Sequence, residues 1–420
     1  MMKTTIKPKG LKGIVSVPPS KSISHRAIIS ASLASGKSRI GNLIFSEDIE
    51  ATCSAMEMFG TSIVKSENSI DIISKGEIKS PTHTIDCKES GSTLRFLVPF
   101  GGIVDEPVVF NGKGKLKTRP MDPYFNIFKQ QNIRYTYDGG LPLMVEGRLK
   151  PGKFDLRGDV SSQFITGLMF VLPFLDGDSE IIITSPLESK GYIDLTIDVL
   201  EKFNVKIINN DHESYYIEGN QKYTPNDMKI EGDYSQAAFW IVAGLIGGNI
   251  EINGLDIDSK QGDSEIIDIV KRMNGKIEAK EDSVVVSRSE TKGTIIDASQ
   301  CPDIVPILTV LAALSDGKTE IINASRLRIK ESDRLKAIAT ELNKLGAQII
   351  EEPEGLVIYG REHLTGGVVD SWNDHRIAMS LAIASIRCTD KVVITNSQAI
   401  EKSYPHFFED FKKLGGDISE

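Results

Sequence analysis

The feature of this sequence that most constrains its fold is a pattern that recurs about every 70 residues. Short polar clusters open an apolar, helix-like run six times, beginning at Lys21, Ser90, Ser161, Tyr234, Pro302 and Asp374. The spacings between these starts are 69, 71, 73, 68 and 72 residues. An internal repeat of this kind predicts a fold built from copies of one supersecondary unit.

A second landmark repeats with the same period. A Gly or Asn ends an amphipathic, helix-like stretch and precedes a short β-branched run at Gly60, Asn132, Asn204, Gly275, Gly346 and Gly415. These positions are 72, 72, 71, 71 and 69 residues apart. Gly and Asn tolerate the left-handed backbone conformation, which commonly follows the last turn of a helix. Glycine-terminated helices occur loosely spaced in any α/β chain, but two landmarks that keep one period favour a true repeat.

Each unit also carries a β-branched, strand-like segment between the two landmarks: RIGNL, PVVFNG, EIIITS, NIEING, TEIINA and VVITNS. A unit is therefore predicted to run helix, strand, helix, turn, strand, with a further strand leading into the next unit. Because 420 residues exceed what one hydrophobic core usually organises, we expect two α/β domains of three units each. The half-way unit start predicts the boundary near residues 228–233, with EGDYSQ as the hinge.

Composition and charge narrow the class of protein. Hydrophobic residues make up 40% of the chain, as in soluble globular proteins, and the net charge of −9 argues against a general binder of nucleic acid or anionic membranes. The four cysteines form no C-x-x-C pair, which argues against a zinc site or a disulfide framework. The N-terminus lacks an apolar signal core, and the longest apolar runs fall short of the ~20 residues of a membrane span. We expect a soluble, cytoplasmic protein.

The starts of the repeat units carry groups that can bind anions. Helix N-termini present free backbone N–H groups and the positive end of the helix dipole, and several of them facing one cleft would form an anion receptor. Basic residues accompany these starts or lie in nearby loops: Lys21, Arg26, Arg95, Lys113, Lys115, Lys117, Arg119, Lys330, Arg334, His375, Arg376 and Lys402. The fourth start, YSQAAFW, carries no charge and is expected to serve packing.

Three polar patterns in the second half stand out, although each has an ordinary structural explanation. RIKESDRL could be a salt-bridged helix start, CPDIVPIL an N-cap at Asp303, and WNDHRIAM a capping network. Together they place cations beside two carboxylates, Asp303 and Glu331, that could move protons. The sequence contains no phosphate-binding P-loop, no metal-ligand spacing and no G-x-S-x-G elbow. This combination favours a metal-free transferase that acts on small polyanions.

A resemblance to a known family agrees with the prediction of a transferase for small polyanions. The segments PPSKSISHRA, GSTLRF, KTRPM, SSQFITGL, SKGYID, PDIVPIL, RIKESDRL, WNDHRIAMS and EKSYPHFFEDF occur in this order across the chain. In order and spacing they resemble the 3-phosphoshikimate 1-carboxyvinyltransferase family, the EPSP synthases of the shikimate pathway. The resemblance implies a two-domain, inverse α/β barrel-like fold of six βαβαββ repeats with the helices packed inside. Residues 13–230 would form the N-terminal domain, and residues 231–420, joined by residues 1–12, the C-terminal domain.

The resemblance also implies a reaction. The enolpyruvyl group of phosphoenolpyruvate would move to the 5-hydroxyl of shikimate 3-phosphate, with release of phosphate by addition and elimination, in a monomer without cofactor or metal. Both substrates are anionic, so Lys and Arg should dominate their binding. The matching motifs imply shikimate 3-phosphate contacts from Lys21, Ser22, Arg26, Ser161, Ser162, Gln163, Ser189, Asp303 and Lys330. They imply phosphoenolpyruvate contacts from Lys21, Gly91, Arg119, Gln163, Arg334, Arg376 and Lys402.

Catalysis would need a general base for the hydroxyl and a general acid for the methylene carbon. Asp303 is the candidate base. Glu331 is the candidate for protonating and then deprotonating the carbon, with Lys21 as an alternative proton carrier and His375 as a supporting group. Closure of the two domains would expel water and gather these residues.

Some residues depart from the family pattern, and two alternatives stay open. Glu89-Ser90-Gly91-Ser92 stands where many members have Asn-Ala-Gly-Thr or Asn-Ser-Gly-Thr, and Phe96 stands where some have proline, so inhibitor sensitivity is open. An enolpyruvyl transferase for a UDP-aminosugar shares the repeats but usually has a cysteine in the loop that here is NGKGKLKTRPM. A non-catalytic polyanion binder could use the same helix N-termini, but carboxylates facing its ligand would weaken binding.

Overall fold

The computed structural model describes residues 2–419 and divides the chain into two compact units. The first unit is Pro19–Ile230, and the second unit is Glu231–Glu420 together with the N-terminal residues up to Pro18. Each unit has its own continuous hydrophobic core. The N-terminal segment therefore crosses between the units after Pro18, six residues later than the sequence boundary at residue 13.

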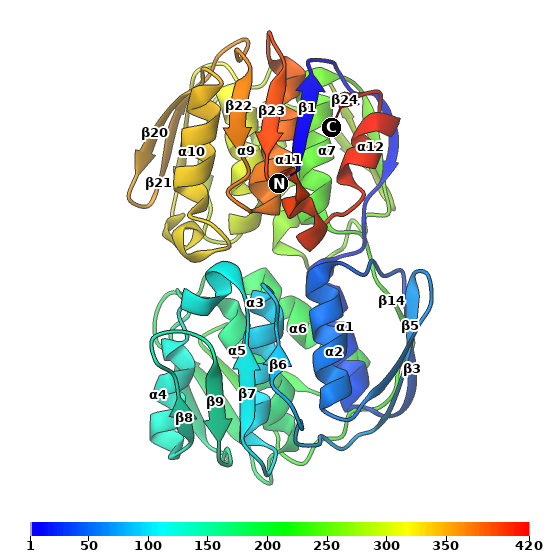
Figure 1. The fold of residues 1–420 in the computed structure, drawn as a ribbon, viewed down its shortest axis with the longest axis vertical. Helices are drawn as coiled ribbons and strands as arrows, with labels where there is room; N and C mark the ends of the chain where they lie inside the picture. Colours follow the sequence, from blue (N-terminus) through cyan, green and yellow to red (C-terminus); the bar gives the residue numbers. More distant parts are fainter. Residues whose placement is uncertain (1, 420) are drawn as a thin grey trace. The chain divides into compact units, whose positions relative to one another are not determined.

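The first unit contains three four-stranded sheets and six α-helices (Figure 1). Its strands are β3 (Ser35–Gly41), β4 (Ser62–Lys65), β5 (Ser69–Lys75), β6 (Ile85–Asp86), β7 (Val108–Asn111), β8 (Arg134–Thr136), β9 (Leu143–Glu146), β10 (Lys153–Leu156), β11 (Ser179–Ile183), β12 (Ile207–Asn210), β13 (Ser214–Ile217) and β14 (Met228–Lys229). Its helices are α1 (Lys21–Leu33), α2 (Glu47–Met58), α3 (Gly91–Leu97), α4 (Asp122–Gln131), α5 (Ser162–Val171) and α6 (Lys190–Lys202).

The second unit repeats this plan (Figure 1). Its strands are β1 (Lys3–Lys7), β2 (Gly13–Ser16), β15 (Ile250–Asn253), β16 (Lys276–Ala279), β17 (Ser283–Ser287), β18 (Ile295–Asp297), β19 (Lys318–Ile322), β20 (Gln348–Glu352), β21 (Gly355–Tyr359), β22 (Gly367–Asp370), β23 (Val392–Thr395) and β24 (Asp417–Ser419). Its helices are α7 (Tyr234–Gly247), α8 (Ile266–Arg272), α9 (Val305–Ala313), α10 (Arg334–Lys344), α11 (His375–Ala384) and α12 (Phe407–Lys413).

All six sheets share one topology, in which one edge strand pairs in parallel and the remaining neighbours pair antiparallel, as in β6-β7-β9-β8 and β2-β15-β17-β16. The predicted strand segments coincide with β3, β7, β11, β15, β19 and β23. The six-repeat α/β architecture is thus confirmed. Three sheets are completed by strands distant in sequence: β14 pairs with β3, β2 with β15, and β1 with β23. The pairing of β2 with β15 explains why the chain crosses after Pro18.

The first helix of each repeat is buried because sheets and other helices surround it. Every residue of α9 and α11 is buried, and so is α7 from Tyr234 to Ile246. A helix enclosed in this way must be apolar nearly all round, which matches its sequence. Among residues 2–419, no helix is long and apolar enough to cross a membrane.

The left-handed residues that end the second helices occur where the sequence predicts them, with one exception. Gly60, Asn132, Asn204, Gly346 and Gly415 have φ angles of 102°, 56°, 63°, 84° and 97°. In the fourth repeat the left-handed residue is Asn274, with φ 64°, and not Gly275. A Cβ on Gly275 would lie 2.5 Å from a methyl carbon of Val270, so Gly275 is needed for close packing instead.

Candidate active site

Polar side chains in the second unit gather at the N-termini of three of its helices. Asp303 lies on the 3₁₀ turn η5 (Pro302–Ile304) that leads into α9, Arg334 opens α10, and Arg376 lies in the first turn of α11. Asp374 caps α11 by accepting a hydrogen bond of 2.9 Å from the backbone N–H of Arg376. The repeat thus brings residues more than 30 positions apart to one end of the helix layer.

Arg334 is the centre of this cluster. Its side chain is only 1% exposed and it contacts three carboxylates. Nε lies 2.8 Å from Asp374 Oδ2, Nη1 lies 2.9 Å from Asp303 Oδ1, and Nη2 lies 2.6 Å from Glu331 Oε2. Burial disfavours the charged guanidinium, but the three carboxylates outweigh burial and raise the pKa of Arg334. Arg334 therefore orients both predicted catalytic carboxylates.

Asp303 is held by three cations. Besides Arg334, Lys330 Nζ lies 3.3 Å from Oδ1, and Arg376 Nη2 lies 3.2 Å from Oδ2. Arg376 also donates to the backbone carbonyl of Asp303 at 3.0 Å. A quarter of the Lys330 side chain is exposed, but the surrounding protein desolvates its ammonium group. That burial and the repulsion of Arg334 and Arg326 lower the pKa of Lys330 to about 8, against the attraction of Asp303.

His375 and Lys402 lie beside the same helix N-terminus. His375 is 2% exposed, and its Nδ1 lies 3.8 Å from Asp374 Oδ1. Lys402, on the 3₁₀ helix η8 (Ser397–Lys402), donates to the backbone carbonyl of Asn373 at 2.8 Å. Burial opposes ionisation of Asp374, but Arg334 and His375 outweigh it and lower the pKa of this carboxyl. The second unit therefore brings together every site residue that the sequence predicts in it.

In the first unit, Lys21 opens α1 behind the N-cap Ser20. Lys21 Nζ lies 2.8 Å from Asp48 Oδ2, at the start of α2. Arg26, one turn further along α1, is 2% exposed and donates to Thr196 Oγ1 and to the backbone carbonyls of Ser22 and Tyr192 at 2.7–2.9 Å. Burial lowers the pKa of Arg26 to about 9. These bonds tie α1 to α6, so the contact of Arg26 with shikimate 3-phosphate stays a prediction.

A second group in this unit surrounds the N-termini of α3 and α5. Gln163 donates to Ser92 Oγ at 3.0 Å and accepts from Arg95 Nη1 at 3.0 Å, which joins the two helices. Arg119 is 5% exposed, and a Cβ added to Gly91 would lie 2.5 Å from its Nη1. Glycine at position 91 therefore lets the guanidinium approach the backbone of α3.

The predicted serines occupy helix starts, but in different ways. Ser161 is the N-cap of α5 and accepts from the N–H of Gln163 at 3.3 Å, and Ser162 is the first residue of that helix. Ser189 precedes α6 with a left-handed φ of 57° and is 3% exposed. The structure thus places Ser161, Ser162 and Gln163 together, while Ser189 lies at the start of a different helix.

Comparisons with known proteins identify the family. The sequence pattern of EPSP synthase (3-phosphoshikimate 1-carboxyvinyltransferase) matches residues 6–411. The chain belongs to the EPSP synthase family. It is similar to the 3-phosphoshikimate 1-carboxyvinyltransferases of Clostridium novyi, with 56% identity over 98% of this chain and 97% of the relative, and of Clostridium acetobutylicum, with 55% identity over 99% and 98%.

Solved structures agree on the fold of the family. The chain is similar to the EPSP synthase structure from Acinetobacter baumannii, with a TM-score of 0.84, 24% sequence identity and full coverage of both chains. This likeness supports the fold of six small sheets. Among residues 2–419, no group of three or more His, Cys, Asp and Glu side chains could hold a metal ion.

Sequence reasoning missed several residues that contact or adjoin the predicted site residues. Asp48 pairs with Lys21, but in the sequence it is one of several acidic residues in an ordinary helix start. His25 Nδ1, Thr52 Oγ1 and Thr93 Oγ1 form a buried chain with steps of 2.7 Å that joins α1, α2 and α3. Burial, Lys21 and Arg26 lower the pKa of His25, so it is a neutral hydrogen-bonding group.

Asp263 is a further residue that no motif indicated. It lies on the 3₁₀ helix η4 (Gly262–Glu265) of the second unit and is 2% exposed. Burial and the negative charge of Asp303 raise the pKa of Asp263 to about 6, against the attraction of Arg376. Asp263 is therefore an electrostatic neighbour of the candidate base, a relation that only tertiary contacts create.

Proposed function

We propose that this chain transfers the enolpyruvyl group of phosphoenolpyruvate to the 5-hydroxyl of shikimate 3-phosphate, in the biosynthesis of aromatic amino acids. The hydroxyl oxygen adds to C2 of phosphoenolpyruvate while C3 gains a proton. Phosphate then leaves C2 and takes up the proton that the base removed from the hydroxyl, and C3 loses a proton to give the enol ether. Family membership and the names of relatives at 52–56% identity support this function.

The observation in the structure that best supports the chemistry is the pair of carboxylates on Arg334. Asp303 and Glu331 are 17% and 20% exposed, and the same buried guanidinium contacts both. Two carboxylates in fixed geometry, with cations around them, can serve as base and acid toward an anionic substrate. A protein that only bound anions would be weakened by them.

In the proposed mechanism Asp303 takes the hydroxyl proton. Lys330, Arg334 and Arg376 hold its carboxylate in place, and the substrate anions would draw Lys330 and Arg376 toward themselves. Glu331 then protonates C3 and later removes a proton from it, with Lys21 as an alternative carrier and His375 in support.

Substrate contacts are proposed from both units, which we take to be the two domains of the enzyme. Cationic and amide side chains and the backbone of one glycine would hold the phosphoenolpyruvate anion. These residues are Lys21, Gly91, Arg119, Gln163, Arg334, Arg376 and Lys402. Arg334 has four hydrogen bonds to carboxylates among the described residues, which leaves one Nη1 hydrogen for a substrate. Shikimate 3-phosphate would meet Lys21, Ser22, Arg26, Ser161, Ser162, Gln163, Ser189, Asp303 and Lys330.

A phosphate-release assay tests the function. Release is expected only when phosphoenolpyruvate and shikimate 3-phosphate are both present, and omission of either should abolish it. Release with a UDP-aminosugar in place of shikimate 3-phosphate would support the related transferase instead. Binding of both compounds without turnover would support a polyanion-binding protein.

We further propose that the protein is a cytoplasmic monomer that binds neither nucleic acid nor membranes. All four cysteines are buried thiols without disulfides, which fits a reducing compartment. Light scattering during size-exclusion chromatography would give the mass in solution, and twice 46.1 kDa would overturn the monomer.

A further inference from the structure

A basic pocket lies in the second unit, away from the candidate active site. Its volume is about 1020 Å³. Residues at the C-terminal ends of α7 and α9 line it, together with the end of the 3₁₀ helix η7 (Ser385–Arg387) that follows α11. Asp303 and Arg376 lie at the N-terminal ends of α9 and α11. At a rise of 1.5 Å per residue, nine to ten helical residues separate the two places by roughly 15 Å.

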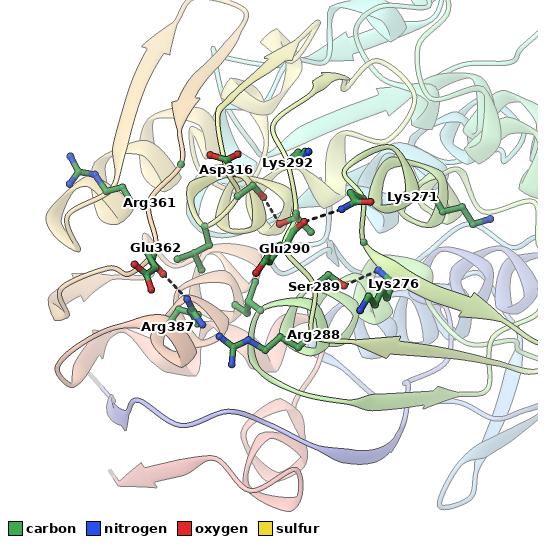
Figure 2. Close-up of a pocket in the computed structure, with 17 residues that line it drawn as sticks. Lys271, Lys276, Arg288, Ser289, Glu290, Lys292, Asp316, Arg361, Glu362 and Arg387 are labelled. Carbon is green, nitrogen blue, oxygen red and sulfur yellow. Dashed lines mark hydrogen bonds between the residues drawn. The ribbon is translucent and has the colours of Figure 1, made fainter.

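Cations dominate the lining of this pocket. Three of its residues are Asp or Glu and six are Lys or Arg, in a chain whose net charge is −9. The cations come from separate segments on different sides of the pocket (Figure 2): Lys271, Lys276, Arg288, Lys292, Arg361 and Arg387. Ile246 and Leu314 add apolar surface.

Two arginines in the pocket lie near each other. Figure 2 shows the side chains of Arg288 and Arg387 directed toward the same part of the pocket. Arg387 Nη2 donates to the backbone carbonyl of Glu362 at 2.8 Å, which fixes its position. Partial burial and the positive charge of Arg288 lower the pKa of Arg387, against the attraction of Glu362. Two like charges held together in a concave surface favour an anion between them.

Ordinary structural roles explain only part of this arrangement. Cations are attracted to helix C-termini, which accounts for Lys271 and Arg387. Arg288, Lys292 and Arg361 instead follow strands β17 and β21. Within residues 2–419, none of these three forms an ion pair with a carboxylate. Neither helix capping nor surface ion pairing therefore requires them in this pocket.

We infer that this pocket binds a small molecule that carries two or more anionic groups, at a site separate from the two substrates. Arg288 and Arg387 would form charge-assisted hydrogen bonds to one anionic group. The other cations lie on other sides of the pocket. A ligand that also binds them therefore needs a second anionic group.

Titration calorimetry with inorganic pyrophosphate tests this site at constant ionic strength. The Arg288→Ala/Arg387→Ala double variant is expected to weaken pyrophosphate binding at least tenfold, with unchanged kcat and KM for both substrates. Arg272→Ala is the matched control, because Arg272 lies beside the pocket but does not line it and pairs with Glu265. Wild-type affinity for pyrophosphate should persist in that control.

Two results would overturn the inference. If the double variant binds pyrophosphate as the wild type does, pyrophosphate occupies only the substrate site. If Arg272→Ala weakens binding equally, a general positive field and not a site attracts the anion. Should the double variant fail to fold, the single Arg288→Glu change at an exposed position gives the same comparison. Because turnover is measured without pyrophosphate, failure here is distinct from failure of the proposed transferase activity.

Discussion

Replacing Arg334 by Met tests whether this residue holds the cluster together. The change removes a buried guanidinium that makes four hydrogen bonds to three carboxylates. Asp374 is 0% exposed and would be left as a buried charge without its arginine. Removing one partner of a buried ion pair typically costs about 3–5 kcal/mol. Asp374 keeps bonds from Ser332 Oγ at 3.0 Å and Arg376 N at 2.9 Å, so we expect about 3 kcal/mol.

Urea denaturation followed by tryptophan fluorescence measures this loss in the relevant unit. The only two tryptophans of the chain, Trp240 and Trp372, both belong to the second unit, so unfolding of the first unit contributes no tryptophan signal. Arg328→Met is a matched control in the same loop. Arg328 contacts Asp333 and Glu351 and donates to the backbone carbonyls of Glu352 and Pro353, but its side chain is 27% exposed and its removal leaves no fully buried charge, so we expect a smaller loss of about 1 kcal/mol.

The pH dependence and a second substitution sharpen the test. In the wild type the depressed pKa of Asp374 adds stability above its unfolded pKa, and this stability is lost only in acid. In Arg334→Met the buried carboxyl of Asp374 loses its arginine and its pKa rises, so the penalty should shrink as the pH falls from about 7 to about 5. Adding Asp374→Asn should recover at least half of the loss. A cost no larger than that of Arg328→Met would refute a central role for Arg334.

The remaining predictions concern turnover and binding. Asp303→Ala should lower kcat by a factor of about 10² or more while phosphoenolpyruvate still binds, and near-normal turnover would remove Asp303 from the mechanism. Because the pKa of Lys330 is lowered to about 8, kcat/KM for shikimate 3-phosphate should fall above this pH as the ammonium loses its charge. Lys330→Arg should abolish that fall, and superimposable pH profiles would contradict the role of Lys330. Asp48→Asn removes the carboxylate that contacts the ammonium of Lys21 and should raise the KM for phosphoenolpyruvate about fivefold to tenfold, the equivalent of one charge-assisted hydrogen bond. The exposed neighbour change Glu47→Gln is the control, and equal effects of the two changes would show that charge at this helix start, not the contact with Lys21, matters.

Much of the fold was predictable because it depends on local preferences repeated six times. The polar starts, the β-branched strands and the left-handed residues each follow from backbone and side-chain chemistry within one repeat. The prediction failed at Gly275, where Asn274 takes the left-handed conformation and Val270 requires glycine for packing. Local sequence does not distinguish these two demands, since both favour a small residue after a helix.

The exchange of strands between repeats was harder to predict from the sequence. β14 and β2 complete sheets whose other strands are far away in the sequence, and β1 takes the third position of a sheet with β22, β23 and β24. A short β-branched strand carries little information about its partner, because several edges offer the same backbone hydrogen bonds. The crossing after Pro18 therefore depended on tertiary pairing.

The sequence by itself determined the repeat, the residue types at the helix starts and, through family motifs, the residues expected to act. Tertiary structure decided what those residues contact. It gave Arg334 three carboxylates, enclosed Arg26 among α1, α5 and α6, and set Asp48 against Lys21. The physical reason is that charge, burial and hydrogen bonding act over a few ångströms in space, whereas these partners lie 3 to 170 residues apart in the chain.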